Sequence, residues 1–152
     1  MVNIIHRIGI KQPIEKVYQA LTSLDGLAHW WTRDVQGNTS EGEKIDFSFY
    51  KKTGDLMGSM TMQVQESVEN AFVRWHCVGG PDDWISTDVT FELSEQDDQT
   101  ILIFGHRNWR ESNEHMAHCS MKWAVFMLSL RAYVETGTGK PSPDDVKIDT
   151  WN

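Results

Sequence analysis

His106 is the residue whose type and position best suit it to chemistry. It follows Leu102 and Phe104 at intervals of two, so the three share one face of a strand, which we assign to the interior. A neutral imidazole there can orient a ligand hydroxyl or act as a general base. The commoner role is a hydrogen-bonded histidine at the rim of a cavity. Both roles remain open from the sequence.

Two further polar pairs are weaker candidates. His115 and His118 stand three residues apart, a spacing that suits metal ligands, but no carboxylate or cysteine partner is evident beside them. Asp82 and Asp83 are adjacent carboxylates that follow a loop rich in glycine and proline. We interpret both pairs as solvated surface groups and predict no metal site.

Other catalytic and cofactor motifs are missing. The sequence Gly-Thr-Gly-Lys at 137–140 follows an expected helix and lacks the upstream glycine of a phosphate-binding loop. No serine or cysteine has the local setting of a nucleophile, and Cys77 and Cys119 are expected to be reduced, buried thiols. We therefore predict no cofactor and name no catalytic residue.

The charge balance limits the partners of this chain. Its 152 residues carry 22 acidic and 14 basic side chains, a formal net charge of −8. Such a charge opposes phosphate backbones and anionic lipid surfaces, so we expect no nucleic-acid partner. The longest apolar run, at 124–128, is too short for a membrane span, and the first residues do not form a signal peptide. We predict a cytoplasmic protein that does not insert into membranes.

The order of the expected elements predicts an α+β fold. A first strand at 2–10 is followed by two short helices at 14–22 and 24–31, and a long helix at 112–136 closes the chain. Six further strands are expected between the helices, at 33–37, 43–50, 56–66, 71–78, 84–94 and 100–108. Their short, turn-rich connections favour antiparallel pairing. We expect residues 142–152 to form a C-terminal tail, and deletion of residues 140–152 to leave most of the stability intact.

Apolar residues recur on two adjoining faces of the closing helix, one of which carries Trp123 and the other Met121. A curved sheet around such a helix often leaves a hollow between the layers, which is the default place for a small-molecule site. From strand alternation and helical spacing, the expected ligand-binding residues are Phe47, Phe49, Met60, Met62, Val89, Phe91, Leu102, Phe104, Trp123 and Met127, together with His106 at the rim.

Tryptophan is abundant, with seven in the chain. Six of them fall in elements that can border the hollow or its mouth, namely Trp30, Trp31, Trp75, Trp84, Trp109 and Trp123. A large apolar body with a single donor suits a binder of planar or amphipathic ligands, and it suits a packed core equally well. If they were exposed, Trp30, Trp31 or Trp84 would instead anchor a protein interface.

Several segments carry a family resemblance, and they are found at 13–22, 27–31, 100–109, Trp123 and 130–137. In order and spacing they resemble START-like (SRPBCC) domains, specifically those related to the activator of heat-shock-protein ATPase. The resemblance covers about residues 2 to 141. It implies a helix-grip fold, in which a seven-stranded antiparallel sheet wraps around the long C-terminal helix, with a START-like domain at 1–141 and the tail at 142–152.

The resemblance implies a fold more directly than a function. Members of the START-like family include lipid carriers, polyketide cyclases and co-chaperone modules, and they share no universal catalytic residue. We predict a non-enzymatic binding protein whose partner is a small hydrophobic or aromatic molecule. One alternative is a cyclase or dehydratase acting on an aromatic or polyketide substrate, with His106 in acid–base work. The other is a co-chaperone-like module with a protein partner, although 152 residues leave no room for the separate N-terminal domain of the eukaryotic co-chaperone.

Overall fold

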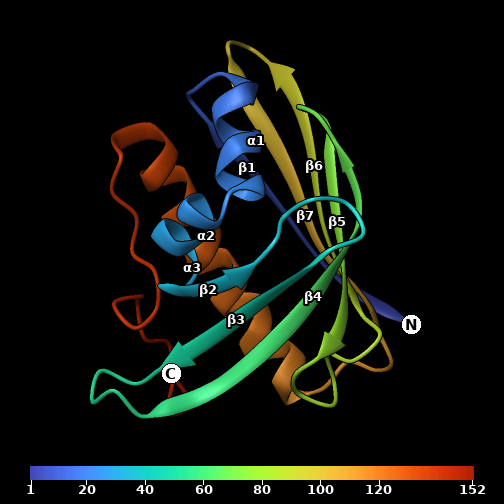
Figure 1. The fold of residues 1–152 in the computed structure, drawn as a ribbon, viewed down its shortest axis with the longest axis vertical. Coiled ribbons are helices and arrows are strands. Elements are labelled where there is room, and N and C mark those ends of the chain that lie inside the picture. Colours follow the sequence, from blue (N-terminus) through green and yellow to red (C-terminus); the bar gives the residue numbers. More distant parts are fainter.

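Seven antiparallel strands form one curved sheet that wraps around a long C-terminal helix in the computed structural model, which describes residues 1–152 (Figure 1). The spatial order of the strands is β1-β7-β6-β5-β4-β3-β2. The strands are β1 (Val2–Ile10), β2 (Asp34–Gly37), β3 (Lys44–Tyr50), β4 (Leu56–Val68), β5 (Phe72–Gly79), β6 (Asp88–Gln96) and β7 (Gln99–Trp109). The helices are α1 (Ile14–Thr22), α2 (Leu24–Trp30) and α3 (Glu114–Thr136). This arrangement confirms the predicted helix-grip fold.

The sheet is irregular where β4 pairs with β5. The pairing of β4 with β5 shifts register between Thr61 and Met62 and again between Val64 and Glu66. Such irregularities bend a strand and increase its twist, because one strand carries an extra residue. As a result β3 and β4 swing away from the central strands, and their far ends extend below α2 and β2 in the view (Figure 1).

The ends of α2 and α3 are fixed by capping residues. The hydroxyl of Ser23 accepts the N–H of Gly26 at 2.9 Å, and the side chain of Asn113 accepts the N–H of Met116 at the same distance. These side chains satisfy amides that have no partner within the helix. Gly137 ends α3 with φ +87°, the left-handed conformation that glycine adopts without strain.

One predicted strand begins later than expected. We placed it at 84–94, whereas β6 starts at Asp88. The preceding residues form tight turns, in which the N–H of Trp84 bonds to the carbonyl of Pro81 and the N–H of Thr87 bonds to that of Trp84, each at 2.9 Å. Ser86 has φ +70°, which no strand residue adopts. Trp84 therefore lies in a loop over the sheet.

The chain after α3 returns along the helix and packs against it (Figure 1). The N–H of Ser142 donates to the carbonyl of Trp31 at 2.8 Å, and the carboxylate of Asp145 forms a buried ion pair with Lys122 of α3. The predicted tail is thus docked on the body, and the expectation that its removal leaves most of the stability intact does not fit these contacts. The domain boundary at residue 141 stays a prediction.

Candidate functional site

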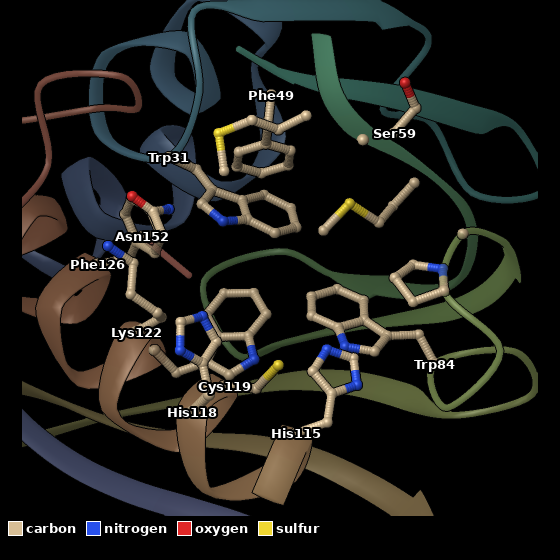
Figure 2. Close-up of a pocket in the computed structure, with 16 residues that line it drawn as sticks. Trp31, Phe49, Ser59, Trp84, His115, His118, Cys119, Lys122, Phe126 and Asn152 are labelled. Carbon is tan, nitrogen blue, oxygen red and sulfur yellow. The ribbon is translucent and has the colours of Figure 1, made fainter. Parts of the chain in front are cut away.

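A cavity lies between the β3–β4 hairpin, the loop after β5 and the N-terminal half of α3 (Figure 2). Its volume is about 570 Å³. Natural pockets for small molecules span roughly 300–1,000 Å³, so the space suits a ligand of that class. The apolar lining consists of Trp31, Phe49, Met57, Met60, Pro81, Trp84, Trp123 and Phe126. The remaining lining residues are Gly58, Ser59, Gly80, His115, His118, Cys119, Lys122 and Asn152.

Three tryptophans from distant parts of the chain form a continuous aromatic wall. The ring of Trp123 on α3 lies 4.9 Å from that of Trp31, and it stacks on Trp84 at 6.0 Å with an interplanar angle of 23°. Trp31 is placed by the end of α2 and Trp84 by the turns before β6. All three side chains are at most 5% exposed, so the wall is closely packed and only a small part of each ring faces the cavity.

His106 lies directly behind this wall. The indole Nε1 of Trp123 donates to its Nδ1 at 3.1 Å, and its Nε2 lies 2.8 Å from the hydroxyl of Thr87. That hydroxyl already donates its single proton to the carbonyl of Trp84 at 2.6 Å, so it accepts from the imidazole. His106 is therefore the neutral tautomer with its proton on Nε2.

The same burial removes acid–base capacity from His106. Burial, assisted by the charge of His115, lowers the pKa of His106 to about 3. Its side chain is completely enclosed and both ring nitrogens have protein partners. A group that catalyses proton transfer must reach the substrate directly or through one water. In this arrangement His106 supports Trp123 and has no free lone pair to offer a substrate.

The only ammonium group of the lining is neutralised by the C-terminal segment. The Nζ of Lys122 forms an ion pair with Asp145, whose side chain is fully buried, and donates to the carbonyl of Val146 at 2.8 Å. A buried carboxylate is stable only with such a partner. The alkyl part of Lys122 is thus left to line the cavity.

Both histidines of the lining are also paired with carboxylates. The Nδ1 of His118 lies 2.6 Å from Asp149, and that of His115 lies 3.1 Å from Asp83. These hydrogen bonds hold the pKa of each carboxyl group below its usual range. The cavity therefore presents no charged side chain that lacks a counter-charge. No group of three or more histidine, cysteine, aspartate or glutamate side chains has a geometry suited to a metal ion.

The Cys119 thiol, which lines the cavity, is not a reactive nucleophile. Burial raises the pKa of Cys119 to about 11, so the thiolate that acts as a nucleophile is scarce at neutral pH. Cys77 is likewise buried with its pKa raised to about 11, and neither cysteine forms a disulfide. Cys119 serves here as a small apolar lining group.

The structure brings three of the eleven predicted site residues to the cavity, namely Phe49, Met60 and Trp123. The other eight lie outside its lining, and seven of them belong to the buried core: Phe47, Met62, Val89, Phe91, Leu102, Phe104 and Met127. The eighth is His106. Large aromatic side chains fill the centre of the fold, so the open space is displaced toward one end of α3. The ligand-binding role of all eleven stays a prediction.

The predicted interface anchors take different positions. Trp30, Trp31 and Trp84 are at most 5% exposed, so none of them is available to anchor a partner, and that part of the partner hypothesis is wrong. Trp151 is the exposed tryptophan, with half of its surface accessible.

Several lining residues were not predicted from the sequence. Phe126 and Lys122 lie on the cavity side of α3, one turn from Cys119 and Trp123, and helical spacing can identify them once Trp123 is placed. Met57 precedes the alternating part of β4, and Asn152 arrives through the docking of the C-terminal segment. No local pattern in the sequence signals either of these two.

No helix of the protein combines the length and apolar character needed to cross a membrane.

Comparison with known proteins gives one family match. Residues 11–135 match the family described as activator of Hsp90 ATPase homolog 1-like protein. A search of curated proteins gives no match.

Solved structures agree with this match. The Aha1 dimer from Colwellia psychrerythraea, determined in solution, is 43% identical, covers 91% of this chain and all of its own, and superposes with a TM-score of 0.78. Protein SSP2350 from Staphylococcus saprophyticus is 15% identical with a TM-score of 0.73, covering 93% of this chain and 98% of its own. Protein CV1439 from Chromobacterium violaceum is 18% identical with a TM-score of 0.73, covering 89% and 99%. The last two resemble this chain in fold alone.

Proposed function

The chain belongs to the family of activator of Hsp90 ATPase homolog 1-like proteins, and within it we propose that this member binds a small, neutral, hydrophobic or aromatic molecule in the cavity beside α3. The observation that carries the proposal is the apolar cavity of about 570 Å³ walled by Trp31, Trp84 and Trp123. The accessible parts of these rings are apolar, and the flexible side chains of Met57 and Met60 in the same lining can adapt to the shape of a ligand.

The neutral character of the ligand follows from the paired charges of the lining. Lys122, His115 and His118 each have a carboxylate partner. A charged ligand would lose its hydration without gaining a free counter-charge, which is unfavourable in an apolar cavity. A neutral molecule avoids that cost and retains the apolar contacts.

Two dyes of nearly the same shape test this proposal. N-phenyl-1-naphthylamine is neutral, and 8-anilinonaphthalene-1-sulfonate adds a negative charge to the same ring system. We expect the neutral dye to bind with enhanced fluorescence and the anionic dye to bind at least about tenfold more weakly, equivalent to 1.4 kcal/mol. Equal affinities would contradict the neutral class, and no response to either dye, with no bound mass in native mass spectrometry, would contradict ligand binding.

A variant that fills the cavity locates the binding site. Gly58 pairs with Phe49 on β3 and shares the inner face of β4 with Met60 and Met62, and a Cβ placed there meets no atom within 4 Å. Gly58→Leu should therefore fold normally and weaken binding of the neutral dye. Gln63→Leu on the outer face of the same strand is the matched control and should leave binding unchanged.

Self-association is a second candidate function, favoured by the outer face of α3. Met121 and Leu128 are 57% and 51% exposed there. With Ala117 and Ala124 they follow steps of four, three and four residues, the spacing of a seam between packed helices. Exposed apolar residues gathered in such a seam mark a site of interaction with a partner. The relative from Colwellia psychrerythraea, 43% identical, is a dimer, and we propose a second copy of this chain as the partner.

The spacing of this face suits a two-fold contact. Met121 and Leu128 are equally distant from the midpoint of Ala124 and Val125, so two antiparallel α3 helices would place Met121 against Leu128 of the second copy. Sedimentation of the full chain should give a dimer, and Met121→Glu should convert it to a monomer. Val68→Glu, at an exposed apolar residue on β4, is the control and should remain a dimer. A monomeric wild type, or a dimeric Met121→Glu, would contradict this candidate.

A further inference from the structure

The C-terminal segment is attached to the body in two unequal halves. The first half, residues 141–145, is held by buried groups: the N–H of Ser142 bonds to the carbonyl of Trp31, and the buried Asp145 pairs with Lys122. The second half, residues 146–152, is called the strap here. Its base is held where Lys122 donates to the carbonyl of Val146 at 2.8 Å.

The side-chain hydrogen bond and the ring contact that the rest of the strap makes with α3 both involve His118. Ile148 and Trp151 also lie beside Ala117 and Met121 of α3. The Nδ1 of His118 lies 2.6 Å from Asp149, and the ring of Trp151 packs on the same imidazole at 5.2 Å. The side chain of Asp149 is 41% exposed, and Trp151 is half exposed. Ion pairs with this exposure contribute little to stability, whereas buried pairs are costly to break. The strap can therefore detach at a much lower free energy than residues 141–145.

The strap also forms part of the cavity. Asn152 lines it on the side where Lys122 and Phe126 lie, and His118 lines it from α3 (Figure 2). The residue that holds the strap is thus itself a wall residue. Release of Asp149 and Trp151 from His118 would uncover that side of the cavity while the anchored residues 141–145 stay in place.

The cavity already opens to solvent beside the exposed Met57 and Pro81. We propose that the strap is a gate on its other side, held in place by the contacts of His118 with Asp149 and Trp151, whose opening widens the entrance through which a ligand enters and leaves. This inference rests on the proposed ligand binding, because it concerns access to the same cavity. A gate that opens before binding slows association and dissociation together. A passive wall changes dissociation alone.

Opening of the strap is measurable without a ligand. Within the strap, the N–H of Trp151 bonds to Asp149 at 2.8 Å and the N–H of Ile148 bonds to the carbonyl of Asn152 at 2.8 Å. We expect these two amides to exchange with solvent deuterium faster than the amide of Ser142 in the full chain. Equal protection of the two halves would overturn the inference.

The kinetic experiment uses N-phenyl-1-naphthylamine as the probe in stopped-flow fluorescence. The variant Asp149→Asn/Trp151→Ala loosens the strap and leaves His118 intact. The control Asp144→Asn removes an exposed carboxylate that pairs with Arg33 in the anchored half, away from the cavity. In the loosened variant the association and dissociation rate constants should both rise about three- to fivefold, the change expected when one exposed ion pair is lost. The control should behave as wild type.

The outcomes separate this inference from the proposed function. Unchanged rates, or a faster dissociation with an unaltered association rate, would overturn the gate while leaving ligand binding intact. If the wild type does not bind the dye, the proposed function fails for this probe, and the exchange rates of the strap amides still decide whether the strap opens.

Discussion

The indole Nε1 of Trp123 donates a hydrogen bond to Nδ1 of His106 at 3.1 Å, which joins a cavity wall to the centre of the sheet. Trp123 reaches the cavity with a small part of its ring, and its only polar atom is engaged on the side of the core. The bond fixes the plane of the ring and the tautomer of the imidazole together. The wall is therefore set in place before any ligand arrives, which reduces the ordering cost of binding.

His106 should remain neutral in the folded protein at every pH above about 3. Nitrogen-15 NMR of the imidazole should show a proton on Nε2, an unprotonated Nδ1 and no titration between pH 7 and pH 4.5. A titrating His106 resonance, or a proton on Nδ1, would contradict the hydrogen-bond chain through Thr87 and Trp123.

The lowered pKa of His106 also makes stability depend on pH. Its pKa is about 3 in the folded protein, against its ordinary value of 6.5 in an unfolded chain. Below pH 6.5 the imidazole binds a proton in the unfolded state but not in the folded state. The contribution of His106 to the free energy of unfolding is therefore fully present above pH 6.5 and is lost as the pH decreases toward 3. The expected slope is roughly 1.4 kcal/mol per pH unit. Urea melts at pH 7, 6 and 5 should show that His106→Gln has a slope smaller by about this amount, and equal slopes would contradict it.

Trp123→Phe and Trp84→Phe form a matched pair at the aromatic wall. Trp123→Phe leaves Nδ1 of His106 buried without a donor, a loss of roughly 1–3 kcal/mol in addition to the smaller ring. The Nε1 of Trp84 is buried and has no hydrogen-bond partner of normal geometry, although the weakly accepting Cys119 thiol lies beside it. Trp84→Phe should therefore cost less. Both variants should alter binding of the neutral dye, and a larger stability loss for Trp84→Phe would contradict the assigned role of Trp123.

The layers of the fold were predictable because each element carries a local signal. Alternation identifies the strands, and the spacing of Trp123, Met127 and Leu130 identifies the buried face of α3. Trp84 was misplaced because an apolar residue after a loop looks like the first residue of a strand. Its turn depends on the positive φ of Ser86, and serine gives little indication of that conformation.

The position of the cavity was less predictable, because it depends on volume. Alternation correctly marks Phe47 and Phe91 as inward residues, but it does not reveal that their rings meet those of Trp31 and Trp75 and fill the centre. The space remains where β4 bends away and Gly58 carries no side chain. Asp145 gives no sequence signal for its distant partner Lys122, so the docking of the C-terminal segment was missed.

Asp145 and Asp144 are adjacent carboxylates with opposite expected contributions. Asp145→Ala leaves the ammonium of Lys122 buried without a counter-charge, and the loss should be about 3–5 kcal/mol. Asp144 pairs with Arg33 on the surface, so Asp144→Ala should cost at most about 1 kcal/mol. Denaturant melts of the two variants provide the comparison. Deletion of residues 140–152 should be at least as costly as Asp145→Ala, and a fully stable deletion variant would contradict the docking of this segment.

Gly26→Ala tests whether the junction of α1 and α2 sets the position of Trp31. A Cβ at Gly26 would lie 2.7 Å from the hydroxyl of Ser23 and 2.8 Å from backbone atoms of Ala20, so the two helices would have to separate. Alanine favours a helix by at most about 1 kcal/mol over glycine, and overpacking against backbone costs typically about 1–3 kcal/mol, so a net loss of stability is expected. Because Trp31 follows α2 directly, binding of the neutral dye should weaken as well.

Gly58→Ala is the control. The new Cβ meets nothing within 4 Å there, so stability should change by no more than about 0.5 kcal/mol. Melts and dye titrations of both variants check this, and a stabilised Gly26→Ala with unaltered binding would mean that the contact between the helices does not position the wall.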